Sequence, residues 1–173
     1  MRELASIFLV GPMGAGKTTI GRHLARLLGK SFVDLDLEIE QRCGAEISWI
    51  FDVEGEEGFR KRESAMLKDL VAGNNIVLAT GGGVVLSAEN RALLKCSGTV
   101  VFLAVAPQIL ISRMQQDTKR PLLQVEDRKA VIEDIVRERE PLYREVADII
   151  FDGHRKTPAV AAQEIVSLIQ QAD

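Results

Sequence analysis

The sequence has few of the features that mark a secreted or membrane-spanning protein. Only two of its 173 residues are cysteines, Cys43 and Cys96, and they lie far apart without a metal-binding spacing. Because disulfide-rich chains belong to oxidising compartments, we expect reduced thiols in a cytoplasmic protein. No apolar run approaches the roughly 20 residues that span a bilayer. The first residues lead directly into an apolar run, so we expect no signal peptide.

Excess charge of one sign is also absent. The formal net charge is -3, and no block of like charges occurs. Nucleic-acid and membrane-surface binding usually need a basic face. We therefore expect neither a nucleic-acid partner nor a membrane partner.

The chain does contain enough apolar material for one hydrophobic core. Hydrophobic residues make up 46% of the 173 residues and charged residues 27%, which is ordinary for a globular domain. We expect a single domain covering 1–173. We also expect a monomer, because no additional apolar element is apparent.

Apolar runs alternate with segments of helical spacing along the whole chain. The expected strands are 5–10, 31–34, 76–80, 99–105 and 147–151. The expected helices are 18–28, 55–72, one starting at Pro107, one around 131–136 that ends or kinks near Pro141, and one starting at Thr157–Pro158. This order predicts an α/β fold with three α/β/α layers and a five-stranded parallel sheet. Two insertions interrupt the alternation, at about 35–63 and at about 115–127, and we expect the second to be a mobile loop.

The sequence GPMGAGKTT, which starts at Gly11, follows the first apolar run and precedes a helix. It has the Walker A spacing, in which the backbone N–H groups of a glycine-rich loop point at phosphate oxygens. Lys17 is expected to reach the outer phosphates, and the hydroxyl of Thr18 to ligate Mg²⁺. The dipole of the following helix favours the same anion. The alternative is a glycine turn that matches this spacing by chance.

Three classes of protein use such a loop. A regulatory GTPase should carry an N-K-x-D motif, and the sequence has none. A large ATPase motor usually has an acidic residue at the end of an apolar strand, whereas the strand at 76–80 runs into three glycines. A small-molecule kinase remains, with the two insertions as acceptor site and lid that close over the substrates to exclude water.

Asp34 and Asp36 follow the second strand, at the sheet edge expected to carry the phosphate loop. If the strand continues, alternation sends both carboxylates to one side. One could then hold Mg²⁺ through water, and the other could bind or deprotonate an acceptor hydroxyl. The alternative is a solvated turn or a helix cap.

Four other features have a functional and a plain structural interpretation. Phe59 beside Arg60 offers an apolar wall next to an anion binder, or a core residue beside an exposed charge. Residues 81–83 are glycines that let a ligand approach the backbone, or a flexible turn. Arg120 could stabilise the transferring phosphate, or lie solvated in a loop. Arg139 could bind substrate, or only interact with a helix dipole.

Together these segments resemble the shikimate kinase family over nearly the whole chain. The motifs are GPMGAGKTT, DLD at 34–36, GEEGFRKRE at 55–63, ATGGG at 79–83, KRPLL at 119–123 and REPLYREVAD at 139–148. The phosphate loop is common to many families, but the other five in series are much more specific. Two departures are small: Thr18 stands where serine is common, and the adenine-side stretch DGHRKTP is variable in the family.

The resemblance implies the nucleoside monophosphate kinase type of P-loop fold and ATP-dependent phosphorylation of the 3-hydroxyl of shikimate, a step towards aromatic amino acids. Its implied catalytic residues are Lys17, Asp36 and Arg120. Its implied ATP-binding residues are Gly14, Ala15, Gly16, Lys17, Thr18, Thr19, Arg113, Arg120 and Arg155, with 155–158 flanking the adenine. Its implied shikimate-binding residues are Asp36, Phe51, Phe59, Arg60, Glu63, Gly81, Gly82, Gly83 and Arg139. Thr18 and Asp34 are the implied Mg²⁺ residues.

Two rival interpretations use the same fold. A gluconate-type or nucleotide kinase should rearrange the trio of Asp36, Arg60 and Arg139. A catalytically silent nucleotide-binding domain should have lost Lys17, Asp36 or Arg120, and all three are present.

Overall fold

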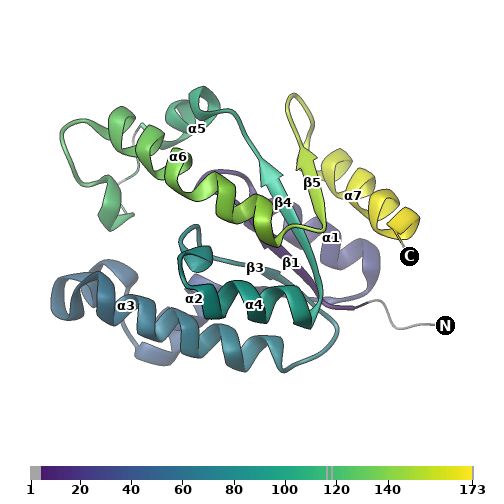
Figure 1. Ribbon diagram of the computed structural model, residues 1–173, viewed down its shortest axis with the longest axis horizontal. Helices are drawn as coiled ribbons and strands as arrows, with labels where there is room; N and C mark the ends of the chain where they lie inside the picture. Colours follow the sequence, from purple (N-terminus) through teal and green to yellow (C-terminus); the bar gives the residue numbers. More distant parts are fainter. Residues whose placement is uncertain (1–4, 116, 118, 173) are drawn as a thin grey trace.

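A parallel sheet of five strands forms the middle of the molecule (Figure 1). The computed structural model describes residues 5–115, 117 and 119–172. The strands are β1 (Ile7–Val10), β2 (Ser31–Asp34), β3 (Ile76–Ala79), β4 (Thr99–Ala104) and β5 (Ile149–Asp152), in the spatial order β2-β3-β1-β4-β5. All neighbouring pairs are parallel. The predicted five-stranded parallel sheet is therefore confirmed.

Helices cover both faces of this sheet. They are α1 (Lys17–Leu28), α2 (Leu35–Cys43), α3 (Ile47–Val71), α4 (Ala88–Ser97), α5 (Pro107–Met114), α6 (Arg128–Val146) and α7 (Pro158–Ala172), with short 3₁₀ helices η1 (Val84–Leu86) and η2 (Pro121–Leu123). Within the described ranges, none of these helices combines the length and apolarity that a bilayer crossing requires.

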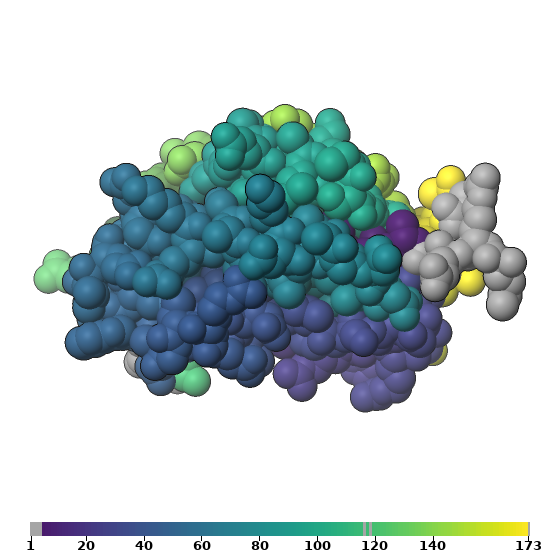
Figure 2. Space-filling view, turned by 90° about the horizontal axis from the view of Figure 1, so that it is seen from below, coloured from purple at the N-terminus to yellow at the C-terminus, as the bar shows by residue number. Residues whose placement is uncertain are grey.

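Alternation along the buried strands divides the core into two layers. Ile7 and Leu9 of β1 pack in the cluster that includes α1 and α7, whereas Phe8 and Val10 pack in the cluster that includes α2, α3, α4 and α6. Successive side chains of a strand point to opposite faces, so a strand buried on both faces is apolar at every position. Figure 2 shows α3 and α4, in blue and teal, forming one continuous surface. The three-layer prediction is therefore confirmed.

The carboxyl ends of all five strands lie at one edge of the sheet, because every pair is parallel. β1 leads into the phosphate loop at Gly11, β2 ends at Asp34, and β3 leads into the glycines at 81–83. Three predicted site segments from distant parts of the sequence therefore meet at this edge.

β2 ends at Asp34, as predicted. A continuation through 34–36 does not occur, because Asp34 accepts a hydrogen bond from the Leu37 N–H (3.1 Å) and starts α2 as its N-cap. A helix end or kink was predicted near Pro141, but α6 does not end there and continues to Val146. The proline removes one backbone hydrogen bond, yet Arg139, Tyr143 and Val146 are buried on the inner face of this helix, and their packing holds it together.

Candidate functional site

The phosphate loop takes the backbone form that anion binding requires. Gly14 and Gly16 have φ of 79° and 94°, in the left-handed region that favours glycine. Gly16 is the N-cap of α1 and provides no side-chain cap, so the first N–H groups of the helix face the cleft. This arrangement is a general binding site for phosphate.

Lys17 is buried at the base of this loop. Its Nζ donates to the carbonyls of Gly11 (2.6 Å) and Pro12 (2.8 Å). Burial lowers the pKa of Lys17 to about 8, while the nearby carboxylate of Asp36 acts in the opposite direction. An incoming phosphate would replace the two carbonyls as the partner of the ammonium group and favour its charged form.

Two carboxylates stand beside the loop with different partners. The Thr18 hydroxyl donates to Asp34 Oδ2 (2.9 Å) while Asp34 also caps α2. Asp34 is therefore a helix cap, as the structural alternative held, and it also lines the cleft. Asp36 lies in the first turn of α2, and its buried Oδ1 has no hydrogen-bond partner within the described residues. Burial raises the pKa of Asp36, the charge of Asp34 adds to this effect, and Lys17 opposes it.

Two guanidinium groups gather in a smaller pocket next to Asp36. Arg60 Nη1 donates to Glu63 Oε1 (2.8 Å), and that carboxylate is 1% exposed. Arg139 is 5% exposed, and its Nε has no hydrogen-bond partner in the described part of the chain. Burial raises the pKa of Glu63, and the charge of Arg60 opposes the rise. The pocket thus presents guanidinium groups, which suit a carboxylate ligand.

The glycine triplet at 81–83 packs tightly against the charged side chains of Asp36, Arg60 and Glu63. A Cβ atom placed on Gly81 would lie 2.8 Å from Glu63 Oε2 and 3.0 Å from Asp36 Oδ1. At Gly83 a Cβ would lie 2.4 Å from both terminal nitrogens of Arg60. The triplet is therefore a place of close approach rather than a plain flexible turn.

Two aromatic rings form a wall of the smaller pocket. Phe51 and Phe59 have ring centroids 4.9 Å apart, and Arg60 lies over the ring of Phe59 at 5.2 Å. Phe59 is 4% exposed and belongs to the core, and it also lines the pocket. Both interpretations of Phe59 are thus compatible with its position.

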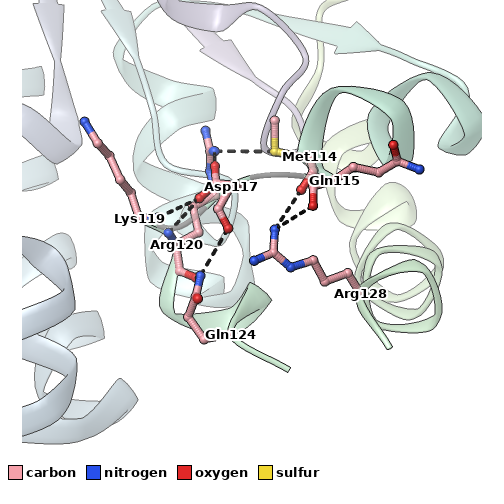
Figure 3. Close-up of polar contacts among 7 residues, drawn as sticks. All are labelled: Met114, Gln115, Asp117, Lys119, Arg120, Gln124 and Arg128. Carbon is pink, nitrogen blue, oxygen red and sulfur yellow. Dashed lines mark hydrogen bonds and ion pairs between the residues drawn. The ribbon is translucent and has the colours of Figure 1, made fainter. Parts of the chain in front are cut away.

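Arg120 lines both cavities. It lies in the segment that follows α5, whose polar contacts are drawn in Figure 3. Its guanidinium forms an ion pair with Asp117 and donates to the sulfur of Met114 (3.4 Å). Asp117 Oδ1 also accepts the backbone N–H groups of Lys119 (2.8 Å) and Arg120 (2.9 Å). Arg128 anchors the end of α5 by donating to the carbonyls of Met114 and Gln115.

The predicted adenine-side arginines lie on the rim of the larger cavity. Arg113 Nη1 donates to the Gly14 carbonyl (2.7 Å), which joins α5 to the phosphate loop. Arg155 has φ of 60° in the turn between β5 and α7. Both residues line the cavity that holds the phosphate loop.

All the predicted site residues are brought together in two adjoining cavities. The larger, about 710 Å³, is lined by every predicted ATP-binding residue and by Asp34 and Asp36. The smaller, about 350 Å³, is lined by every predicted shikimate-binding residue. The residues that line both cavities are Met13, Asp36, Gly81, Gly82 and Arg120.

Sequence reasoning missed several residues of this site. Asp117 lines the smaller cavity and pairs with Arg120. The sequence feature that could have indicated this pairing is its place in a loop, three residues before an arginine. Ile47 and Ser48 line the same cavity from the start of α3, but neither residue type indicated a binding role in the sequence.

The model of the family described as shikimate kinase matches residues 13–170 of this chain. The shikimate kinase of Histophilus somni (strain 2336) is 55% identical over 170 residues, covering 98% of this chain and 97% of its own length. That of Vibrio parahaemolyticus is 53% identical over 171 residues, covering 99% of each chain.

Solved structures show the same similarity. Shikimate kinase from Acinetobacter baumannii, in complex with shikimate, superposes with a TM-score of 0.95 at 49% identity, covering 97% of this chain and 94% of that chain. A gluconokinase from Sinorhizobium meliloti 1021 reaches a TM-score of 0.59 at 15% identity, covering 99% of this chain and 94% of that chain. The second similarity shows a shared fold only.

Proposed function

The chain belongs to the shikimate kinase family, and from this premise we propose how its cleft carries out the reaction. It is an ATP-dependent small-molecule kinase that transfers the γ-phosphoryl group of ATP to the 3-hydroxyl of shikimate, giving shikimate 3-phosphate and ADP. The roles of its individual residues are the proposal.

The observation that carries the proposal is the position of Asp36. Its buried carboxylate lines both cavities, and Oδ1 has no hydrogen-bond partner in the described ranges. A hydroxyl bound in the smaller cavity would satisfy this oxygen while facing a phosphate held by the loop. Phosphoryl transfer depends on such positioning more than on a strong base, so Asp36 orients the hydroxyl and accepts its proton.

The acceptor end of the cleft matches the chemistry of shikimate, a ring with one carboxylate and three hydroxyls. Arg60 and Arg139 bind the carboxylate, and Glu63 orients Arg60 through its 2.8 Å hydrogen bond. Phe51 and Phe59 cover the ring. A guanidinium binds a carboxylate through two parallel N–H···O bonds, which fixes orientation as well as affinity.

The nucleotide end stabilises charge on the transferring group. Lys17 exchanges its two carbonyl partners for phosphate oxygens, and Arg120 leaves Asp117 to reach the same group. Arg113 and Arg155 flank the adenine side. Preorganised cations of this kind act most strongly where water is excluded.

Mg²⁺ fits beside Thr18 and Asp34. Their oxygens lie 2.9 Å apart at the start of α1, and hydroxyl, carboxylate and water oxygens are the ligands that Mg²⁺ prefers beside nucleotide phosphates. In this proposal Thr18 would ligate the ion, and Asp34 would hold it through water. When bound, the ion neutralises charge on the β- and γ-phosphates.

We further propose that 35–63 is the shikimate-binding segment and 115–127 the lid of one kinase domain. Residues of both segments line the smaller cavity, which supports this division. The cytoplasmic location, the monomeric state and the absence of nucleic-acid and membrane partners stay predictions.

The test is ADP release with shikimate, gluconate, AMP or no acceptor, each with ATP and Mg²⁺. We expect turnover with shikimate alone. Turnover with gluconate or AMP but not with shikimate would overturn the assignment of the acceptor pocket.

A further inference from the structure

We propose that Tyr143 is a positioning residue for shikimate, whose hydroxyl orients the Gly82–Gly83 peptide and the neighbouring Arg139. The inference rests on the proposed acceptor site. Tyr143 does not line either cavity of the cleft, so it acts through these groups and not by contact with the substrate.

The Tyr143 ring is held too firmly for its hydroxyl to turn elsewhere. The side chain is 1% exposed, and its ring stacks on Phe102 of β4 with centroids 5.2 Å apart and an interplanar angle of 27°. The hydroxyl donates to the carbonyl of Gly82 at 2.5 Å. Packing of the ring between its own helix α6 and strand β4 therefore fixes the position of the Tyr143 hydroxyl.

Fixing this carbonyl also fixes an N–H group. The carbonyl of Gly82 and the N–H of Gly83 belong to one planar trans peptide unit and point in opposite directions. Glycines have no side chain to restrain their backbone. The hydroxyl of Tyr143 supplies that restraint, and the N–H of Gly83 is directed to the opposite side of the peptide.

The restrained peptide lies among the groups proposed to bind the acceptor. A Cβ atom on Gly82 would be 3.3 Å from the backbone nitrogen of Met13 and 3.7 Å from Arg139 Nη1. The Arg60 guanidinium packs directly on Gly83. A rotation of this peptide would therefore disturb both arginines of the acceptor pocket and the edge of the phosphate loop.

Tyr143 also faces Arg139 directly, one helical turn earlier on the same side of α6. Burial raises the pKa of Tyr143 to about 12, and the nearby guanidinium of Arg139 acts in the opposite direction. The hydroxyl is thus protonated at neutral pH and remains a donor to Gly82, while its oxygen faces the cation.

The first experiment is steady-state kinetics of Tyr143→Phe, which removes the hydroxyl and keeps the stacked ring. We expect the KM for shikimate to rise roughly 5- to 30-fold, the effect of losing one buried hydrogen bond, and the KM for ATP to change by less than about 2-fold. An unchanged KM for shikimate, or an equal rise in both constants, would overturn the proposal.

Asn90→Ala is the matched control. It removes another buried side chain-to-backbone hydrogen bond of the same segment, from Asn90 Nδ2 to the Val84 carbonyl (3.0 Å). We expect it to lower the melting temperature without raising the KM for shikimate. An equal rise in the KM for shikimate would mean that any weakening of the 81–86 segment has this effect and would overturn the specific role of Tyr143.

A second measurement needs no substitution that risks the fold. Tyr143 is the single tyrosine of the chain, so 3-fluorotyrosine labels this position alone, and its ¹⁹F resonance reports on the hydroxyl environment. We expect shikimate to shift the resonance more than ADP does. An unshifted resonance at saturating shikimate would overturn the proposal, whereas wild-type enzyme without shikimate turnover would overturn the proposed function itself.

Discussion

At the scale of single residues, burial moves the pKa values of an acid and a base in the cleft towards each other. It lowers the pKa of Lys17 to about 8 and raises the pKa of Asp36 above its ordinary value. Each group opposes the shift of the other, because opposite charges favour their ionised forms. If both residues act in the reaction as proposed, activity is confined between two limits of pH, one set by each residue.

The first prediction concerns kcat/KM for ATP as a function of pH. It should fall as pH rises through about 8, because Lys17 of the free enzyme loses the proton that phosphate binding needs. It should also fall on the acid side at a higher pH than an ordinary aspartate would cause, because Asp36 becomes protonated there. The measurement is the pH profile of initial rates at low ATP.

The profile of kcat at saturating ATP is its internal control. Bound phosphates raise the pKa of Lys17, so the basic limb should move to higher pH. A kcat/KM profile that stays flat well above pH 8 would contradict the assignment of that limb to Lys17.

The second prediction separates Arg60 from an arginine two positions further on. Arg60→Ala removes a guanidinium from the acceptor pocket and leaves Glu63, 1% exposed, without its partner. We expect the KM for shikimate to rise roughly 100-fold, since losing a buried charged contact costs about 2–5 kcal/mol. The affinity for ATP, measured by isothermal titration, should stay near normal.

Arg62→Ala is the control for this prediction. Arg62 binds Glu54 through two hydrogen bonds of 2.7 and 2.6 Å, outside both cavities. Its loss should leave the KM for shikimate unchanged. If the two substitutions weaken shikimate binding equally, or if Arg60→Ala weakens ATP and shikimate binding equally, Arg60 does not bind shikimate as proposed.

At the scale of elements, the strands were the most predictable part of the fold. β2 lies at the predicted residues, and β1, β3 and β4 lie within the predicted runs, because strands buried on both faces are apolar throughout. β5 starts two residues later than predicted, at Ile149, since Asp148 instead accepts the Val100 N–H through its carboxylate (2.8 Å). The phosphate loop and the helix after it could be predicted equally well, from the spacing of the glycines, Lys17 and Thr18 and from the apolar positions that follow.

Helices stabilised mainly by tertiary contacts were harder to predict. α2 starts immediately at the end of β2, so its first residues resembled a continuing strand. α4 was missed, although Ser87 caps it by accepting a hydrogen bond from the Asn90 N–H (3.3 Å). α3 starts at Ile47, but Gly55 within it has a non-helical φ of 71°. The predicted helix start at 55 coincides with this break. The role of Tyr143 could not be predicted, because its partner is 61 residues away.

The third prediction concerns the lid and the carboxylate of Asp117. Burial acts to raise the pKa of Asp117, but the backbone N–H groups of Arg120 and Lys119, together with the charge and side-chain hydrogen bond of Arg120, outweigh this effect, so the pKa is lowered. Asp117 thus organises the loop, and in the proposed mechanism it competes with ATP for Arg120. Asp117→Asn keeps an oxygen acceptor for the loop and removes the competing charge.

We expect Asp117→Asn to tighten ATP binding by up to about 5-fold, since a surface ion pair is worth at most about 1 kcal/mol. Asp117→Ala removes the acceptor as well and should weaken ATP binding relative to Asp117→Asn. Titration calorimetry with ADP and with a non-hydrolysable ATP analogue measures both. If the two variants bind ATP with equal affinity, the backbone hydrogen bonds that Asp117 accepts do not contribute to ATP binding.

At the scale of the whole molecule, the two cavities are lined by largely different parts of the chain and share only a few of their lining residues. The phosphate loop lies between β1 and α1, whereas the acceptor pocket is lined from α2, α3, the glycine triplet, the segment around η2, and α6. Trp49 lies in the first half of α3, before the break at Gly55, and is 61% exposed. Its neighbours Ser48 and Phe51 line the acceptor pocket, so a movement of this helix segment on shikimate binding would change the environment of the indole.

Trp49 is the single tryptophan of the chain, so its fluorescence isolates this movement. We expect shikimate to change the emission in a saturable way, with a midpoint that matches its dissociation constant, because an exposed indole is sensitive to altered solvent contact. Arg60→Ala should require far more shikimate for the same change, while Arg62→Ala should not. Emission that stays constant at saturating shikimate would contradict a movement of the segment before Gly55 on binding.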